Sequence, residues 1–351
     1  MPGYSDMRVW LRLVFLSCVM VFTPASWAAD TGGAKEQAQR QQDQPLNNAP
    51  LWTDVRRGEN PYQTTQVRGV ETNVLVQSGG EVWRQIRNGP VTIYGGWLLI
   101  VVCAIIAAIF FLKGPIKLHD KPSGRLIERF NSLERVTHWT MGICFCVLGV
   151  TGLTLLFGKY VLLPMFGYTL FSWLAILSKN VHNFVAPLFV LSLLVFIVIY
   201  IKDNLPEKGD LAWIAKGWRM FAGEHLPSGR FNAGEKAWFW IGVVLLCLVV
   251  SASGLILLFP NFEQGRLLMQ QASVIHAVAA VLVIGFSLGH IYMGTIGVEG
   301  AYQNMRTGYT DETWAKEHHE YWYNEVKGQA RPAGGARSPV HASAVKEGWK
   351  L

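Results

Sequence analysis

Four histidines stand in or at the edges of long apolar segments: His138, His182, His276 and His290. Ionisable side chains inside a membrane are costly, so each is a candidate functional residue. His276 and His290 lie 14 residues apart in one segment. At about 100° and 1.5 Å per residue, both rings project from nearly the same helix face, about 21 Å apart along the axis. Neutral imidazole is a strong iron ligand, so metal or haem binding is the chemistry that these residues offer.

Five apolar runs must position these histidines. They span residues 91–112, 139–157, 181–201, 237–259 and 272–293. None contains Lys, Arg, Asp or Glu, and each is long enough to cross a bilayer. The chain is 51% hydrophobic and 16% charged, whereas about a quarter of the residues of a soluble domain are charged. We therefore expect an all-α membrane protein, with a four-helix core at 138–293 and one additional span at 91–112.

Basic residues predict the orientation of the spans. The loops 113–137 and 202–236 carry six Lys or Arg each, whereas 158–180 carries two and 260–271 carries one. The positive-inside rule places the two basic loops in the cytoplasm. A sixth candidate span at 161–177 would move the second basic loop outside, so we interpret that segment as interfacial or re-entrant.

This topology gives each histidine of the last span a partner at its own depth. His138 begins the second span at its cytoplasmic end, level with His290, and His182 begins the third span at its external end, level with His276. A low-spin b-type haem takes two axial nitrogens, so the pairs predict two haem b groups stacked across the membrane. Small residues would allow a flat macrocycle between the helices; they are Gly142, Gly149, Gly152, Ala279, Ala280 and Ser287.

Other interpretations are weaker. A single intramembrane histidine often only hydrogen-bonds between helices, but four in depth-matched pairs are hard to explain in this way. Zinc or copper is disfavoured because no Cys, Asp or Glu joins the histidines. The five cysteines form no CxxC or CxxCH motif, which argues against an iron–sulfur cluster or a covalently attached haem. The net charge of +7 forms no basic stripe and predicts no nucleic-acid partner.

The flanking segments have different compositions. Residues 1–28 resemble a secretory signal peptide, and 29–90 form an external segment that is expected to be partly disordered. After the last span, 294–327 is expected to be a cytoplasmic helical segment and 328–351 a disordered tail. Five further histidines lie in soluble segments and suggest no special role: His119, His225, His318, His319 and His341.

Several motifs occur between residues 129 and 326: RVTHW (135–139), NVHNF (180–184), RFNAGEKAWFW (230–240), VIHAVAAVLVIGFSLGHIYM (274–293) and WAKEHHEYWYNEV (314–326). Over this range the chain resembles the cytochrome b (gamma) subunit of respiratory formate dehydrogenase. The di-histidine helix alone would also fit hydrogenase and thiosulfate reductase cytochromes, whereas the NAGEK and HHEYWY segments favour formate dehydrogenase. The signal peptide and first span make this chain resemble a long form of the family.

The resemblance implies specific roles and partners. His182 and His276 would hold the external haem, which takes electrons from an iron–sulfur beta subunit beside a molybdenum or tungsten catalytic alpha subunit. His138 and His290 would hold the cytoplasmic haem. Asn232 and Gly234, with His290, would contact a quinone (ubiquinone or menaquinone) in a bacterial inner membrane.

Three alternatives stay open. Asn232 precedes the fourth span and could cap that helix as well as contact quinone. Arg135 lies one turn before His138; we favour a topology-determining role for it over pairing with a haem propionate. The chain could instead serve a hydrogenase or another molybdo-oxidoreductase, or be a haem-free transporter or scaffold, although no inverted repeat supports the last.

Overall fold

The computed structural model describes residues 56–57, 78–224, 226–262 and 264–333. The chain falls into two units, Met1–Gln85 and Ile86–Leu351. Most of α4 (Ser78–Ile86) belongs to the first unit, and an ion pair of 2.7 Å joins its Glu81 and Arg84 side chains. The expected signal peptide at 1–28 and most of the expected external segment lie outside the described residues.

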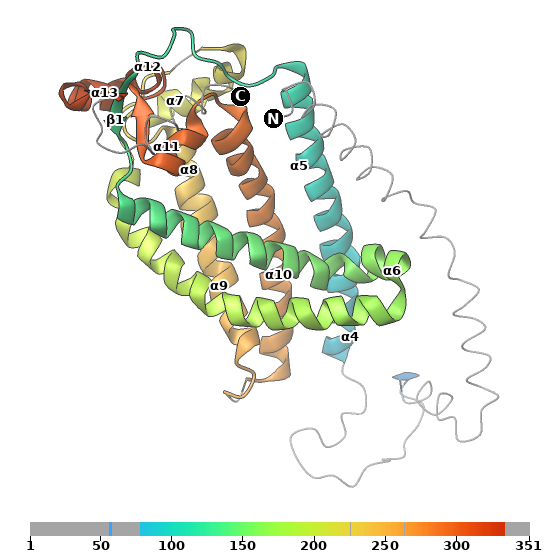
Figure 1. Cartoon of the computed structure of the whole chain (residues 1–351). Helices are drawn as coiled ribbons and strands as arrows, with labels where there is room; N and C mark the ends of the chain where they lie inside the picture. Colours follow the sequence, from blue (N-terminus) through green and yellow to red (C-terminus); the bar gives the residue numbers. More distant parts are fainter. Residues whose placement is uncertain (1–55, 58–77, 225, 263, 334–351) are drawn as a thin grey trace. The chain divides into compact units, whose positions relative to one another are not determined.

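From Ile86 onward the described chain is mainly helical (Figure 1). The long helices are α5 (Thr92–Leu112), α6 (Ser132–Tyr200), α9 (Cys247–Leu258) and α10 (Arg266–Tyr292). Wider π-helical turns adjoin them at η2 (Arg87–Val91), η5 (Trp238–Leu246) and η6 (Met293–Gly297). The short helices are η3 (Lys202–Asn204), α7 (Asp210–Lys216), η4 (Gly217–Ala222), α8 (Ala233–Ala237), α11 (Ala301–Thr307), α12 (Glu312–His318), α13 (Glu320–Val326) and η7 (Lys327–Gln329).

Within these described ranges, four helical stretches are long and apolar enough to cross a membrane. They are Gly79–Leu112, Ser132–Tyr200, Ala233–Leu258 and Arg266–Gly297. The all-α transmembrane fold predicted from the sequence is thereby confirmed. The stretches begin earlier than expected, because polar residues also continue a helix beyond its apolar part. At Ser132 the start is fixed by a capping box, in which Asn131 and Glu134 each accept the other's backbone N–H.

Helix α6 holds the second and third expected spans in one 69-residue element. Gly167 adopts φ 72° and ψ 174° there, a conformation that favours glycine, and the chain reverses so that two arms lie side by side (Figure 1). The Tyr200 hydroxyl donates to the Glu134 carbonyl at 3.0 Å, which joins the far ends of the two arms. The segment 161–177, expected to be an interfacial or re-entrant element of its own, is the helical tip of this hairpin.

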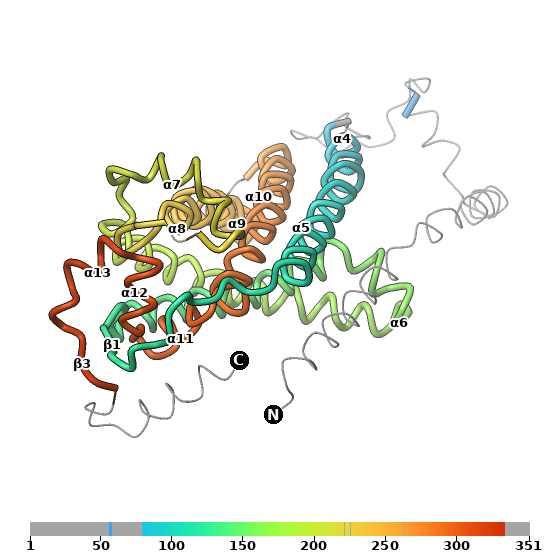
Figure 2. The backbone as a smooth tube through the Cα atoms, turned by 90° about the horizontal axis from the view of Figure 1, so that it is seen from above, coloured from blue at the N-terminus to red at the C-terminus, as the bar shows by residue number. Residues whose placement is uncertain are grey.

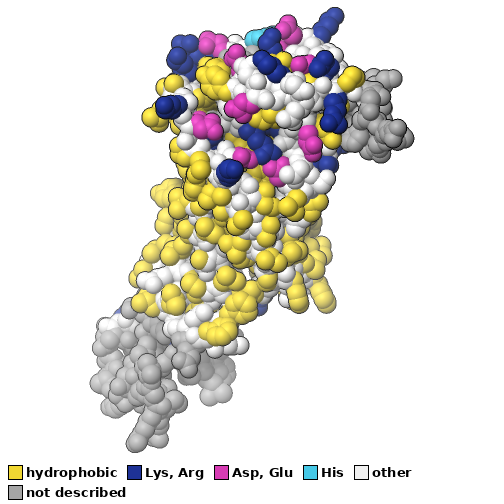
Figure 3. Space-filling view, turned by 90° about the vertical axis from the view of Figure 1, so that its left-hand side faces the viewer, with side chains coloured by type: hydrophobic (Ala, Val, Ile, Leu, Met, Phe, Trp, Pro, Cys, Tyr) yellow, Lys and Arg dark blue, Asp and Glu magenta, His cyan; other side chains and the backbone are white. Residues whose placement is uncertain are grey.

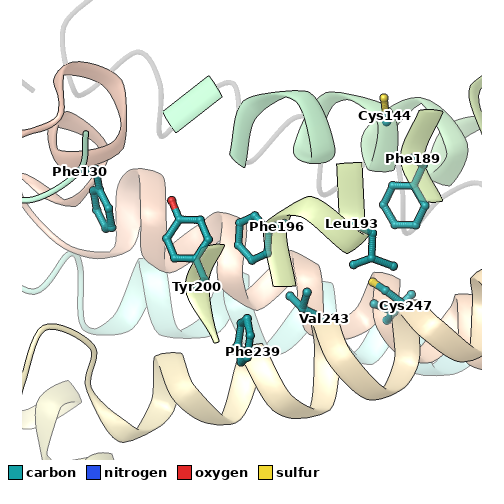
Figure 4. Packing of buried hydrophobic residues seen from close by; sticks show 10 residues of the cluster. Phe130, Cys144, Phe189, Leu193, Phe196, Tyr200, Phe239, Val243 and Cys247 are labelled. Carbon is teal, nitrogen blue, oxygen red and sulfur yellow. The ribbon is translucent and has the colours of Figure 1, made fainter. Parts of the chain in front are cut away.

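Buried side chains from α6, η5, α9 and α10 form most of the main core. Leu193 and Val243 are almost completely buried there, and Phe196 lies between Tyr200 and Phe239 (Figure 4). Helix α10 lies between α9 and α5 (Figures 1 and 2). Glycine allows the close approach of α5, since a Cβ at Gly95 would lie 3.3 Å from Val281. The α6 arms keep large apolar side chains exposed, including Phe184 at 85%, as a lipid-facing surface requires.

A polar cap covers one end of these helices. It contains a three-stranded antiparallel sheet in the order β2-β1-β3, with β1 (Arg125–Glu128) pairing with β2 (Tyr309–Asp311) and β3 (Arg331–Pro332). Figure 3 shows Lys, Arg, Asp and Glu side chains gathered at this end, above a band of apolar side chains.

The cap corrects two expectations about the C-terminal segment. Residues 309–311 form a strand where a helix was expected, and 328–333 continue into η7 and β3 where a disordered tail was expected. Pairing with β1 orders both pieces, and a local pattern does not reveal a partner so distant in sequence. Residues from 334 onward lie outside the described ranges.

Candidate functional site

The structure brings the four candidate histidines together as two pairs. The ring centres of His182 and His276 lie 6.2 Å apart, and those of His138 and His290 also lie 6.2 Å apart. A metal–imidazole bond of about 2 Å, with the ring centre about 1 Å behind the nitrogen, places two axial rings about 6 Å apart. The pairs therefore fit a six-coordinate haem iron. Both join α6 to α10, His290 near the C-terminal end of α10 and His276 about three turns after its start.

Hydrogen bonds orient the outer pair, His182 and His276. Nδ1 of His276 lies 3.0 Å from the Val250 carbonyl, which can only accept, so this nitrogen holds the ring proton. Nδ1 of His182 lies 2.8 Å from Oγ1 of Thr151, whose own proton is donated to the Val147 carbonyl at 2.8 Å. The Val250 carbonyl favours an unprotonated Nε2 on His276, and Thr151 favours the same form of His182 when its hydroxyl donates to Val147; this is the form that binds a metal.

A cavity of about 300 Å³ opens between the outer histidines. Its wall is mostly apolar and includes glycines of the facing helices. A Cβ at Gly254 would lie 3.1 Å from Cε1 of His276, and one at Gly152 would lie 3.4 Å from Cε1 of His182, whereas one at Gly149 would meet nothing within 4 Å. The cavity wall also contains Ser251, whose buried hydroxyl has no hydrogen-bond partner among the described residues. These features fit a large flat cofactor.

The inner pair, His138 and His290, has a different environment. The Trp238 indole stacks on the His290 ring, with centres 5.1 Å apart and planes 15° apart. Nδ1 of His138 is buried and has no hydrogen-bond partner among the described residues. Phe196 adds a second aromatic ring, 6.3 Å from His138. The inner rings are thus held by aromatic packing, whereas Nδ1 hydrogen bonds hold the outer rings.

The expected quinone residues Asn232 and Gly234 lie shortly before Trp238, whose ring stacks on His290 of the inner pair. Asn232 caps α8: its side-chain oxygen accepts the Glu235 N–H at 3.0 Å, and Glu235 accepts the Asn232 N–H at 2.7 Å. Gly234 lies under the Trp213 ring, which a Cβ would approach to 3.1 Å. Trp238 follows one turn later and reaches His290. The capping role of Asn232 is therefore present in the structure.

Two residues make contacts that the sequence did not reveal. Arg135 bonds the carbonyls of Met305 and Arg306 on α11, so it ties the cap to the start of α6. His319, which suggested no special role, is 1% exposed, and its Nδ1 lies 2.8 Å from the Gly229 carbonyl. Burial, aided by the positive charge of Arg129, holds the pKa of His319 well below its usual value. The only sequence signal for this packing was the dense HHEYWY aromatic segment.

Arg129 is the central cation of the cap. Its guanidinium reaches the Arg230 carbonyl at 2.8 Å and Oε1 of Glu235 at 3.3 Å, and it lies 5.0 Å from the Trp314 ring centre. Arg230 in turn bonds Glu134, at the start of α6, at 2.8 Å. Burial lowers the pKa of Arg129, and Glu235 opposes this effect. The starts of α6 and α8 are therefore held together at the end where the inner pair lies.

Comparisons with known proteins place this chain among bacterial cytochromes. A family model described as prokaryotic cytochrome b561 matches residues 129–308. The chain is 30% identical over 210 residues to the formate dehydrogenase cytochrome b556(fdo) subunit of Escherichia coli K12, which is 57% of this chain and 93% of that protein. Identity to the nitrate-inducible cytochrome b556(Fdn) subunit of the same strain is 29% over 209 residues, or 58% and 93% of the two chains. A formate dehydrogenase cytochrome b556 subunit of Haemophilus influenzae is 27% identical over 211 residues, or 57% and 83%.

The chain belongs to the prokaryotic cytochrome b561 family. Membership implies b-type haem and a role in electron transfer, and the similarity to formate dehydrogenase cytochrome b556 subunits supports a place in an enzyme complex. The family resemblance noted in the sequence is thereby confirmed. The match begins at residue 129, so η2 and α5 lie outside it.

Proposed function

We propose that this chain is the quinone-reducing, di-haem membrane subunit of a formate dehydrogenase. The proposal rests on two pairs of imidazoles at two depths along α10. In each pair the ring centres lie 6.2 Å apart. A b-type haem bound there supplies reversible one-electron chemistry of iron. His182 and His276 hold the outer haem, and His138 and His290 hold the inner haem.

The chain's own residues do four things in this proposal. The imidazoles clamp the two haems, and the apolar helices around them exclude water. The Nδ1 contacts of His182 and His276 keep the outer ligands in their metal-binding tautomer. Near the inner haem, Asn232 and Gly234 contact the quinone head, and Trp238, one turn after Gly234, stacks on His290.

Charge distribution supports the direction of transfer. The two basic loops meet where Arg129 bonds the Arg230 carbonyl, and Lys and Arg side chains gather at that end (Figure 3). The positive-inside rule places such an end in the cytoplasm. The outer pair then faces the periplasm, where an iron–sulfur beta subunit and a molybdenum or tungsten alpha subunit deliver electrons from formate. Quinone takes its protons at the cytoplasmic side of the inner membrane.

Histidine replacement tests the proposal. His182→Leu and His276→Leu are each expected to remove one haem and leave the other, and His138→Leu and His290→Leu are expected to remove the second. Haem per protein is measured in the purified complex from the alkaline pyridine spectrum. The same sample identifies the partner subunits by mass spectrometry, where a nickel–iron subunit would instead indicate a hydrogenase. Two haems in His276→Leu would contradict the assignment.

A further inference from the structure

Arg87 stands at the wall of the outer cavity. It belongs to η2, outside the residues that the family model matches, yet it lines the same cavity as His182 and His276. The side chain is half-buried. The backbone at Arg87 is held in place by the Thr92 hydroxyl, which donates to the Arg87 carbonyl at 2.6 Å.

Arg87 is the only Lys, Arg, Asp or Glu among the described residues that line this cavity. The rest of the wall is mostly apolar, with polar groups such as Asn183, Ser251 and Ser273. Among the described contacts, the guanidinium donates to the neutral side chain of Asn88 at 3.1 Å. A guanidinium beside an apolar cavity is stabilised by an anion, and carboxylates match its fork geometry.

A haem held by His182 and His276 supplies such an anion. Its edge bears two propionate groups, whereas the rest of the macrocycle is apolar and suits the cavity wall. We infer that Arg87 binds a propionate of the outer haem, so that the helix preceding the family core contributes a cofactor-binding residue. The inference rests on the proposed function, because it requires haem between His182 and His276.

The packing of α5 against α10 fixes the position of Arg87 relative to His276. Helix α5 continues from η2 and lies along α10 through close contacts of small residues: a Cβ at Gly95 would be 3.3 Å from Val281, and one at Gly285 would be 3.1 Å from Leu98. The same helix α10 holds His276. Arg87 and the haem ligand are therefore positioned by one rigid contact between two helices.

Arginine substitution in the full-length complex tests the inference. Arg87→Gln removes the cation, Arg87→Lys keeps a charge but loses the fork, and Arg84→Gln is the matched control, an exposed arginine that pairs with Glu81 and does not line the cavity. Haem per protein and the two midpoint potentials are measured. A nearby cation favours ferrous over ferric haem, so Arg87→Gln is expected to lower one potential or lose that haem. Arg87→Lys should restore part of the effect, and Arg84→Gln should match the wild type.

The inner haem serves as the internal control for folding. Its retention at an unchanged potential in Arg87→Gln shows that the chain is folded, and a second measurement in a His290→Leu background isolates the outer haem. Two haems at wild-type potentials in Arg87→Gln would overturn the inference while leaving the proposed function intact. Loss of a co-purifying anionic phospholipid with unchanged potentials would also overturn it, since a headgroup would then be the anion. A wild-type complex without haem would instead remove the proposed function.

Discussion

The hydroxyl of Thr151 lies 2.8 Å from Nδ1 of His182 and donates its own proton to the Val147 carbonyl. One side chain thus connects the backbone of the first α6 arm to the candidate ligand on the second arm. When the hydroxyl donates to Val147 it can only accept from the ring, which favours the tautomer of His182 that leaves Nε2 free.

Thr151→Val keeps the shape of this side chain and removes the hydroxyl. Groups that orient metal-bound histidines typically change metal affinity by about 10- to 100-fold. We expect the outer haem to be retained at least about 10-fold less firmly, measured as haem lost during prolonged detergent washing. Thr154→Val is the control, since the described contact of that exposed hydroxyl is the Val150 carbonyl at 3.0 Å. Equal haem retention in the two variants would contradict the assigned role.

Gly254→Ala places a methyl group 3.1 Å from Cε1 of His276. The ring must then shift, which moves its nitrogen from the position that faces His182. We expect a partial loss of one haem, measured by the pyridine spectrum. The control is Gly265→Ala at the start of α10, where a Cβ would meet nothing within 4 Å. Normal haem content in both variants would show that this glycine is not needed for the site.

Two substitutions of Asn232 separate its capping role from its proposed quinone contact. Asn232→Ala removes the cap of α8 and is expected to cost about 1 kcal/mol of stability. Asn232→Asp keeps a good capping oxygen but lacks the amide N–H group. We expect Asn232→Asp to retain wild-type thermal stability and to raise the KM for quinone. An unchanged KM in a stable Asn232→Asp protein would limit the residue to capping.

His319 predicts a pH dependence of the cap. Its pKa in the folded protein lies well below the unfolded value of about 6.5, so the unfolded chain binds the proton more readily. This contribution to stability is present above about pH 6.5 and is lost as the pH falls, by up to about 1.4 kcal/mol per pH unit. Thermal unfolding between pH 7.5 and pH 5 should therefore show a smaller loss of stability in His319→Gln than in the wild type. Parallel pH profiles would exclude His319 as the source.

Much of this architecture could be predicted because it follows from the period of the α-helix and the length of the apolar runs. The spans follow from apolar runs, and the pairing of His138 with His290 and of His182 with His276 follows from a 14-residue spacing and alternating span direction. That these pairs bind haem is still a prediction. The position of the α6 reversal at Gly167 was not evident, because helical residues continue on both sides of it.

The cap was mostly missed, for a different physical reason. The strand pairing of Leu126 with Asp311 joins short segments that are far apart in sequence, and neither has enough alternating residues to identify it as a strand. The same holds for His319, whose burial depends on contacts with Ser228 and Gly229 from another loop. Arg87 was not singled out because a lone arginine before a span resembles an ordinary boundary residue.

The sheet that joins β1 to β2 and β3 has a consequence for biogenesis. Strand β1 is made before all four candidate histidines, whereas β2 and β3 are among the last described residues to leave the ribosome. This sheet therefore cannot form until residues 309–332 have been made. Helices can insert and adjust against one another before it forms, and completion of the C-terminal segment then locks their ends in place.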